Sequence, residues 1–121
     1  PSFLEKRREN AELFVKLFKD HSNYLIQKDI DKSSWFGFSL IIKPNSNLKR
    51  KDIINILQKN KIECRPIVTG NFVRNEVMKY FDYEVHEELK NANHLHDNGF
   101  FVGNSHKCLS KNINFLSQIL S

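Results

Sequence analysis

The chain has 121 residues, of which 40% are apolar and ten are Phe, so that one domain with its own core is expected and a disordered chain is excluded. The formal net charge is +5, but 14 of the 19 basic residues are Lys spread along the chain, which favours a solvated surface over a nucleic-acid-binding patch. No apolar run approaches the roughly 18 residues of a membrane span, and the charged residues 5–9 are unlike a signal peptide.

The first third of the chain predicts one helix and two strands. Apolar residues recur at three-, four- and seven-residue spacing over residues 3–20, which predicts an amphipathic helix. Residues 24–27 form a candidate short strand. Residues 35–42, which are aromatic and β-branched between polar loops, predict the strongest strand of the chain. Gly37 within it indicates a bulge or a close approach of another backbone segment.

A second helix and a third strand are predicted next. Residues 48–59 carry one apolar helical face, and Asn47 is the expected N-cap. Residues 61–64 then predict a short strand that leads into the pair Arg65-Pro66. Because the residue before a proline avoids the helical region, Arg65 is expected to be extended.

A sharp turn is predicted at Thr69-Gly70-Asn71, since Gly and Asn both tolerate positive φ. Asn71 is well placed to cap a short helix that lies between residues 71 and 81.

Two arginines flank this turn, and Arg74 is expected in the first turn of the short helix. Backbone N–H groups at a helix start, with Arg65 and Arg74 nearby, form a candidate site for an anionic or hydroxyl-rich ligand. The alternative is that one arginine pairs with a surface carboxylate, either Glu76 or Asp82.

The last third predicts two helices around a buried strand. Residues 85–98 show a helical pattern that Gly99 ends, and residues 100–102 form a fully apolar strand of the kind buried in a sheet. A tight loop over residues 103–106 leads to a final helix capped by Ser110. This order of elements predicts an α+β fold, a small sheet covered by helices.

We expect one domain over residues 1–121, and a chain that begins with Pro1 instead of Met is expected to be part of a longer protein. Cys64 and Cys108 are 44 positions apart without a CxxC pair, which argues against a structural zinc site. Two buried thiols in a cytoplasmic protein are the expectation, with a disulfide as the alternative.

The chemically active residues form binding groups without a complete catalytic set. His94 and His96 are two apart on a predicted helix and therefore point to different faces, so that they do not chelate one ion easily. The run His106-Lys107-Cys108 is not a catalytic triad, because adjacency in sequence does not supply the geometry. Glycine occurs at four positions and forms no phosphate-binding loop.

Three short motifs, in the right order and spacing, resemble one known family. They are Trp35-Phe36-Gly37-Phe38, then Arg65 followed by Gly70-Asn71-Phe72-Val73-Arg74, then Phe100-Phe101-Val102-Gly103-Asn104. Over nearly its full length the chain resembles the C-terminal small domain of the DegT/StrS sugar aminotransferases. Within that family it is most similar to the nucleotide-hexose 3-dehydratases of deoxysugar and lipopolysaccharide biosynthesis.

The resemblance implies a fold-type-I enzyme that depends on pyridoxal phosphate (PLP) or pyridoxamine phosphate (PMP), with an antiparallel-type sheet in its small domain. The cofactor and the catalytic lysine, or the histidine that replaces it in the dehydratases, belong to an N-terminal domain outside these residues. The chain is then expected to be inactive alone and to supply the substrate side of the site. The whole enzyme is expected to be a cytoplasmic homodimer without a membrane partner.

The resemblance also implies which residues bind the nucleotide sugar. Arg65, Asn71 and Arg74 correspond to positions that contact the sugar or its diphosphate, and Asn104 and His106 are expected to line the same cleft. No catalytic, cofactor-binding or metal-binding residue is expected in this chain.

The sequence departs from the dehydratase pattern after the second arginine, where Asn75-Glu76-Val77 replaces a Pro-aromatic pair. Arg65-Pro66 is typical of the plain aminotransferases, whereas Gly70-Asn71 is typical of the dehydratases. Dehydration and transamination therefore both remain open. So do two other functions: a basic nucleic-acid-binding module, and a structural or dimerisation domain without catalysis.

Overall fold

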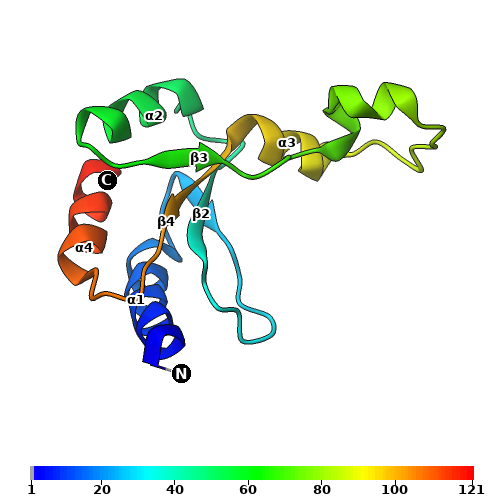
Figure 1. The fold of residues 1–121 in the computed structure, drawn as a ribbon. Coiled ribbons are helices and arrows are strands. Elements are labelled where there is room, and N and C mark those ends of the chain that lie inside the picture. The colour runs from blue at the N-terminus through cyan, green and yellow to red at the C-terminus, as the bar shows by residue number, and fades with distance from the viewer. Residues whose placement is uncertain (1) are drawn as a thin grey trace.

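The computed structural model describes residues 2–121, and the structural statements below refer to these residues. The helices are α1 (Ser2–Phe18), α2 (Arg50–Lys59), α3 (Lys90–Asn98) and α4 (Ser110–Ile119), and the strands are β1 (Tyr24–Ile26), β2 (Gly37–Ile42), β3 (Cys64–Pro66) and β4 (Gly99–Gly103). Two short 3-10 turns, η1 (Phe72–Arg74) and η2 (Glu76–Tyr80), lie between β3 and α3 (Figure 1).

The four strands form one antiparallel sheet in the order β1-β2-β4-β3. The late strand β4 therefore lies between β2 and β3, and it brings the C-terminal third of the chain into the centre of the domain. This arrangement confirms the predicted α+β fold with a small sheet covered by helices.

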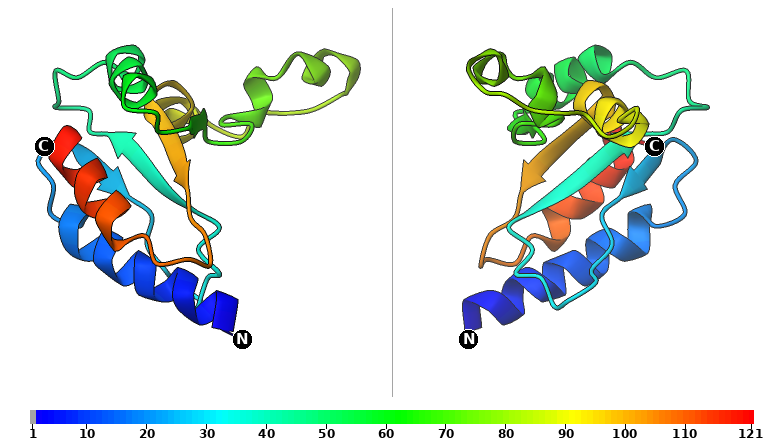
Figure 2. Two further views of the ribbon diagram at one scale, coloured as in Figure 1. Left: turned by 60° about the vertical axis from the view of Figure 1, so that its left-hand side comes forward. Right: turned by 90° about the vertical axis from the view of Figure 1, so that its right-hand side faces the viewer.

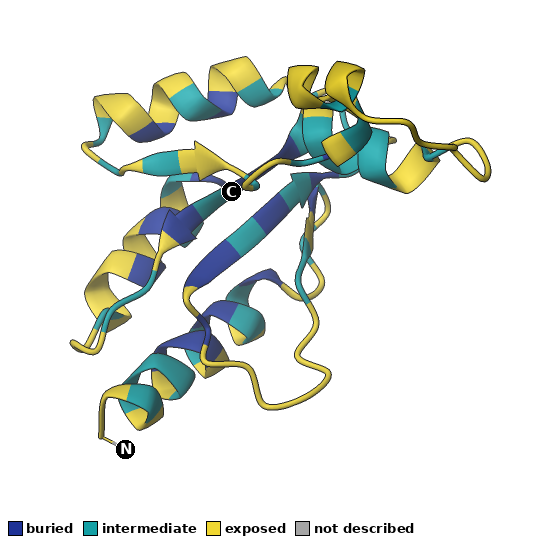
Figure 3. Ribbon diagram, turned by 45° about the vertical axis from the view of Figure 1, so that its right-hand side comes forward, coloured by how far each residue is buried: buried dark blue, intermediate teal, exposed yellow. Residues whose placement is uncertain are grey.

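One face of the sheet forms the core. Residues at every second position of β2 and β4 are buried, namely Phe38, Leu40, Ile42, Phe100 and Val102, and Figure 3 shows the alternation along β2. Helices α1 and α4 lie side by side on one side of the sheet (Figure 2). Since α1 buries Ala11, Phe14 and Phe18, the predicted amphipathic helix at the N-terminus is confirmed, and α4 adds Ile113 and Leu116 to the core.

The opposite face of the sheet is only partly covered. Its side chains come from the alternate positions, so Ser39, Phe101 and Arg65 lie in one row across β2, β4 and β3. Ser39 and Phe101 are half-buried and Arg65 is exposed. We call this the open face. The predicted close approach at Gly37 is on this side: a Cβ there would lie 2.9 Å from the Phe101 ring.

Two predicted helix caps are wrong. The residues at the N-cap positions of α2 and α4 are Lys49 and Leu109, and neither side chain forms a capping hydrogen bond. At α4 a side chain from another helix provides the cap: the side chain of Asn10 in α1 accepts a hydrogen bond from the Leu109 backbone N–H at 3.1 Å. Asn47 and Ser110 therefore do not cap these helices, and tertiary packing replaces the local cap.

The segment between β3 and α3 contains less α-helix than predicted. The helix expected between residues 71 and 81 is a pair of 3-10 turns, and the helix expected over 85–98 begins only at Lys90. Val85, expected on the inner side, is exposed. The pattern failed because the described part of the domain offers this segment no apolar surface, and helices of this length depend on such packing.

The two thiols are free, and the prediction that both are buried is wrong. Cys64 is half-buried and Cys108 is exposed. Burial raises the pKa of the Cys64 thiol, whereas a hydrogen bond with Ser110 lowers the pKa of Cys108. Across residues 2–121, none of the helices is both long and apolar enough for a membrane crossing.

Candidate functional site

The predicted sharp turn is present, and it requires glycine. Gly70 has φ of +60°, and its backbone N–H donates to the Ile67 carbonyl at 2.6 Å. A Cβ at Gly70 would lie 2.6 Å from Nδ1 of His96, closer than any side chain tolerates. The left-handed conformation and the closeness of α3 therefore both exclude a larger residue.

Asn71 anchors this turn to α3. It is buried, its backbone N–H donates to Nδ1 of His96 at 3.0 Å, and its side-chain amide donates to Asn93 at 2.9 Å. Its Oδ1 accepts from the Val73 backbone N–H at 3.1 Å, which confirms the predicted capping role. Since Nδ1 of His96 accepts a hydrogen bond, its ring proton is on Nε2.

Arg74 also binds to α3. Its Nη1 donates to Oδ1 of Asp97 at 2.8 Å, and both side chains are about half exposed. The surface pairing weighed for an arginine is thus observed here, but the partner is Asp97 and neither Glu76 nor Asp82. Asp97 lies on the same helix as Asn93 and His96, which bind the turn. One helix therefore holds both Asn71 and Arg74.

Arg65 lies on β3 at the edge of the open face. Its Nε and Nη2 both donate to Oε1 of Glu63, at 3.1 and 2.8 Å. The two side chains are 70% and 78% exposed, so the pair contributes only about 0–1 kcal/mol to stability. A guanidinium has five N–H donors, and three of them remain available to a ligand.

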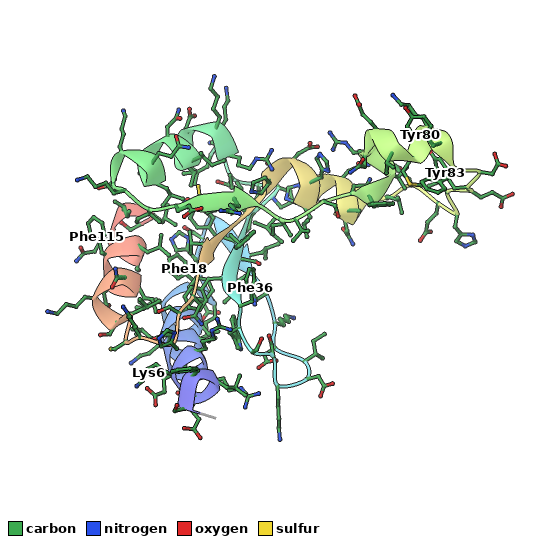
Figure 4. The ribbon with its side chains drawn as sticks, viewed as in Figure 1. Lys6, Phe18, Phe36, Tyr80, Tyr83 and Phe115 are labelled. Carbon is green, nitrogen blue, oxygen red and sulfur yellow. The ribbon has the colours of Figure 1, made fainter. Side chains whose placement is uncertain are left out.

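A shallow hollow adjoins Arg65 on the open face. Its volume is about 250 Å³, and it is lined by Phe36, Glu63, Arg65, Phe101 and Gly103. The rings of Phe36 and Phe101 are 5.8 Å apart, and Phe36 is 69% exposed (Figure 4). A second hollow shares both rings and adds the hydroxyl-bearing residues Ser33, Ser34 and Ser39. Aromatic faces, hydroxyls and a guanidinium suit a ligand with a ring and an anionic group.

Three of the candidate residues thus form two separate groups. Asn71 and Arg74 belong to the turn that α3 holds, while Arg65 belongs to the hollow with Phe36 and Phe101. Within residues 2–121, Arg65 pairs with Glu63 and Arg74 pairs with Asp97. The turn also lacks an α-helical N-terminus, since η1 has three residues and Asn71 already accepts from the Val73 N–H.

Asn104 is fully engaged within the domain. Its amide nitrogen donates to the carbonyls of Arg7 and Trp35 at 3.0 and 2.9 Å. Its Oδ1 accepts from the Asn10 amide at 3.1 Å and from the Ser105 backbone N–H at 2.8 Å. Two donors and two acceptors are all that an Asn side chain offers, so Asn104 ties the loop after β4 to α1 and to the start of β2.

His106 is exposed on the same loop, and its ring lies 4.5 Å from that of Phe3 in α1. It thus belongs to the end of the domain where α1 begins. Within the described residues there is no group of three or more His, Cys, Asp and Glu side chains that could hold a metal ion.

Three residues of the hollow were missed as ligand contacts in the sequence: Phe36, Glu63 and Phe101. Strand alternation contained the signal for Glu63, because positions 63 and 65 share a face. Phe36 and Phe101 lie inside the motifs that carried the family resemblance, but a ring in a strand motif usually belongs to the core. Only the register of β4 reveals that Phe101 faces away from it.

Comparison with known proteins identifies the family of this chain. Residues 1–114 match the DegT/DnrJ/EryC1/StrS aminotransferase family. The chain belongs to this family. Because the match extends over most of the domain, it includes the strand motifs, the Gly70-Asn71 turn and the Arg65 hollow alike.

Two similar proteins carry the name of a GDP-sugar dehydratase. GDP-4-keto-6-deoxy-D-mannose 3-dehydratase of Escherichia coli O55:H7 is 50% identical over 121 residues, which are 99% of this chain and 31% of the dehydratase. A solved structure of GDP-4-keto-6-deoxymannose-3-dehydratase with a trapped PLP-glutamate geminal diamine has a TM-score of 0.96 and 49% identity, covering 100% of this chain and 32% of that one. Another structure of it, a mutant with bound GDP-perosamine, gives the same values. The chain therefore spans about a third of the length of its relatives.

Proposed function

We propose that this domain is the substrate side of a PLP- or PMP-dependent enzyme that acts on nucleotide-linked keto-deoxyhexoses in deoxysugar or lipopolysaccharide biosynthesis. The observation that carries the proposal is the 50% identity with a GDP-4-keto-6-deoxy-D-mannose 3-dehydratase over 99% of the chain. That identity favours C-3 dehydration over transamination, and it favours a GDP-linked substrate.

The cofactor belongs to the preceding part of the longer protein in this proposal. When bound, PLP or PMP supplies the electron sink for chemistry at the sugar carbons. In this proposal the catalytic lysine, or the histidine that replaces it in the dehydratases, belongs to that part as well. The role of this chain is therefore to bind and orient the substrate.

The open face is suited to this role. The rings of Phe36 and Phe101 offer apolar surface to a sugar or a base, and serine hydroxyls lie in the adjoining hollow. Arg65 supplies charge for a phosphate or a hydroxyl. Because Glu63 binds it in an exposed pair, exchanging this carboxylate for a ligand oxygen costs little.

The turn provides the second element of the proposed site. Asn71 holds the turn against α3, and Arg74, which follows the turn and pairs with Asp97, is a second cationic group. Asn104 contributes by position, since its four hydrogen bonds fix the loop that bears Gly103 at the edge of the hollow. His106 presents an exposed ring on that loop and is the more accessible of the two for a ligand.

The assembly follows from the same proposal. The working enzyme is a cytoplasmic homodimer in which this domain packs against its own cofactor-bearing domain, and the isolated 121 residues are inactive. A nucleic-acid partner has less support, because no basic cluster accompanies the aromatic hollow: Arg65 there is paired with Glu63.

The test uses the full-length protein with PLP, glutamate and GDP-4-keto-6-deoxy-D-mannose. A 3-deoxy product supports dehydration, and a 3- or 4-amino sugar supports transamination. Absence of any turnover of the nucleotide sugar would overturn the proposal.

Arg65→Ala tests the role of the open face in that assay. It should raise KM by roughly tenfold or more, since a charge-assisted hydrogen bond contributes about 1.5–3 kcal/mol. Lys111→Ala, which removes an exposed charge on α4, is the matched control and should leave KM unchanged. Equal kinetics for wild type and Arg65→Ala would favour a structural or dimerisation role for the domain.

A further inference from the structure

Residues 72–89, which we call the arm, leave the body of the domain. They comprise η1, η2 and the irregular segment that leads to α3. Figure 1 shows the arm projecting away from the sheet and its helices, and Figure 4 shows Tyr80 and Tyr83 at its far end.

The arm carries an unusual amount of exposed apolar surface. Six of its large apolar side chains are exposed: Phe72, Val77, Tyr80, Phe81, Tyr83 and Val85. Tyr80 is 76% and Phe81 60% exposed. Scattered apolar residues are normal on a surface, but a concentration of aromatic rings on one projecting segment marks an interaction site.

The contacts between arm and body lie at the base of the arm. Arg74 pairs with Asp97 at 2.8 Å, and the preceding Asn71 is held by α3. Beyond Arg74, the arm's hydrogen bonds in the part of the chain that the structure describes stay within the arm or reach Lys90 and Asn93 of α3, at the other base of the arm. Among them, Asn75 accepts from the Val77 N–H at 3.0 Å and shapes η2. The far end thus has a defined form without support from the body.

A relative with its whole chain present has the same form. The dehydratase structure matches all of this chain with a TM-score of 0.96, although these residues are only 32% of its length. The arm makes up more than a tenth of the residues, so a score this high excludes a different course for it. The projecting form is therefore the one found when the remaining two thirds of such a protein are present.

The charge of the arm differs from that of the rest of the chain. Asp82 and Glu84 flank Tyr83, and Glu87 and Glu88 follow, whereas the chain as a whole has a net charge of +5. Aromatic residues with a polar rim are typical of a docking surface. The acidic rim also makes the basic body of a second copy or a basic surface of the same polypeptide a suitable neighbour.

We propose that the arm packs its aromatic end against the cofactor-bearing part of the same polypeptide and holds the Arg65 hollow against that part. This inference rests on the proposed function. The arm begins at the Gly70-Asn71 turn, next to the residues proposed to bind substrate, so it grips the part of the protein that those residues face. Helix α3 binds both the turn, through Asn71, and the base of the arm, through Arg74.

The test is photo-cross-linking in the full-length protein, with Tyr80 replaced by p-benzoylphenylalanine. We expect cross-links within one polypeptide, located by peptide mass spectrometry outside residues 1–121. Phe115 on α4, 43% exposed and outside the arm, is the matched position and should give far lower yield. Cross-links that produce a dimer-sized species would overturn the proposal in favour of a second copy. A yield no higher than at Phe115 would overturn it as well.

A stability measurement on the same protein gives an independent readout. The double variant Tyr80→Ser and Phe81→Ser should lower the Tm of the full-length protein, while Phe115→Ser should not lower it to the same extent. Equal effects of the two would contradict the proposal. Cross-linking and Tm do not require turnover, so an inactive protein with an arm cross-link would refute the proposed function and leave the arm contact in place.

Discussion

The body of the domain and its arm contain the same kinds of aromatic residue and use them in opposite ways. Phe14 and Phe38 in the body are 0% and 1% exposed, with stacked rings 4.5 Å apart, whereas Phe81 in the arm is 60% exposed. Burial and contact, more than residue type, decide what each ring contributes to stability. The rings of the body therefore contribute to the stability of the fold, whereas the exposed rings of the arm contribute little to it.

The polar side chains follow the same division. In the body, Asn10 and Asn104 form a largely buried network that joins α1, β2 and the loop before α4. On the open face, Arg65 and Glu63 meet only each other, in an exposed pair. The first arrangement fixes the fold, and the second leaves donors for a ligand.

Truncating one phenylalanine in each region should give the largest contrast. Phe14→Ala creates a cavity in the core and should reduce the free energy of unfolding of the 121-residue chain by about 3–5 kcal/mol. Phe81→Ala removes an exposed ring and should change it by no more than about 0.5 kcal/mol. Urea denaturation followed by circular dichroism measures both. Similar losses for the two variants would show that the arm packs on the body in solution.

The network around Asn104 should rank next. Asn104→Ala leaves the carbonyls of Arg7 and Trp35 without their side-chain donor, which should cost about 2–3 kcal/mol. Asn112→Ala, an exposed position on α4, is the matched control and should stay near wild type. If Asn104→Ala folds as stably as the control, the network has no structural role and a substrate contact becomes the better account of Asn104.

Substituting alanine at two glycines compares a strained position with a position where only the size of the residue changes. Gly70→Ala places a methyl group 2.6 Å from His96 in a left-handed backbone, and should cost about 1–2 kcal/mol. At Gly103 nothing lies within 4 Å of a new Cβ, so Gly103→Ala should stay within about 0.5 kcal/mol of wild type. Thermal unfolding of both variants measures the difference, and equal Tm values would contradict the strained turn.

The sequence predicted the body well because its patterns are enforced by packing. The helix periodicity of residues 3–20, the strand at 35–42 and the apolar strand at 100–102 all correspond to elements that meet in one core. The turn at Gly70 was predicted equally well, since few residues other than glycine tolerate its positive φ and the close approach of α3.

The arm and the caps were harder to predict for physical reasons. Val85 and Leu89 have helical spacing, but both precede Lys90, where α3 begins, so periodicity alone extended this helix over residues 85–89. The N-terminal end of α4 is capped by the side chain of Asn10, which is almost a hundred positions away in the chain. No local sequence motif predicts such a contact. The position of Phe101 on the open face required the register of β4, because strand motifs do not reveal which face is covered.

The smallest expected effect concerns a polar atom inside the body itself. Tyr24 is 1% exposed, and its hydroxyl has no hydrogen-bond partner in the described residues. Tyr24→Phe removes this unpartnered group and keeps the ring, so at pH 7 it should leave the free energy of unfolding unchanged or raise it by up to about 1 kcal/mol. A clear loss of stability would mean that the hydroxyl has a partner in solution.

The same residue should make the body sensitive to alkali. Burial raises the pKa of Tyr24 to about 12, whereas an unfolded tyrosine has a pKa of about 10. Between these values the unfolded chain binds fewer protons than the folded one, so stability falls as the pH rises from 10 toward 12. Tyr24→Phe should flatten this decline. Denaturation midpoints measured across that pH range decide between a buried tyrosine in the body and a general alkaline effect.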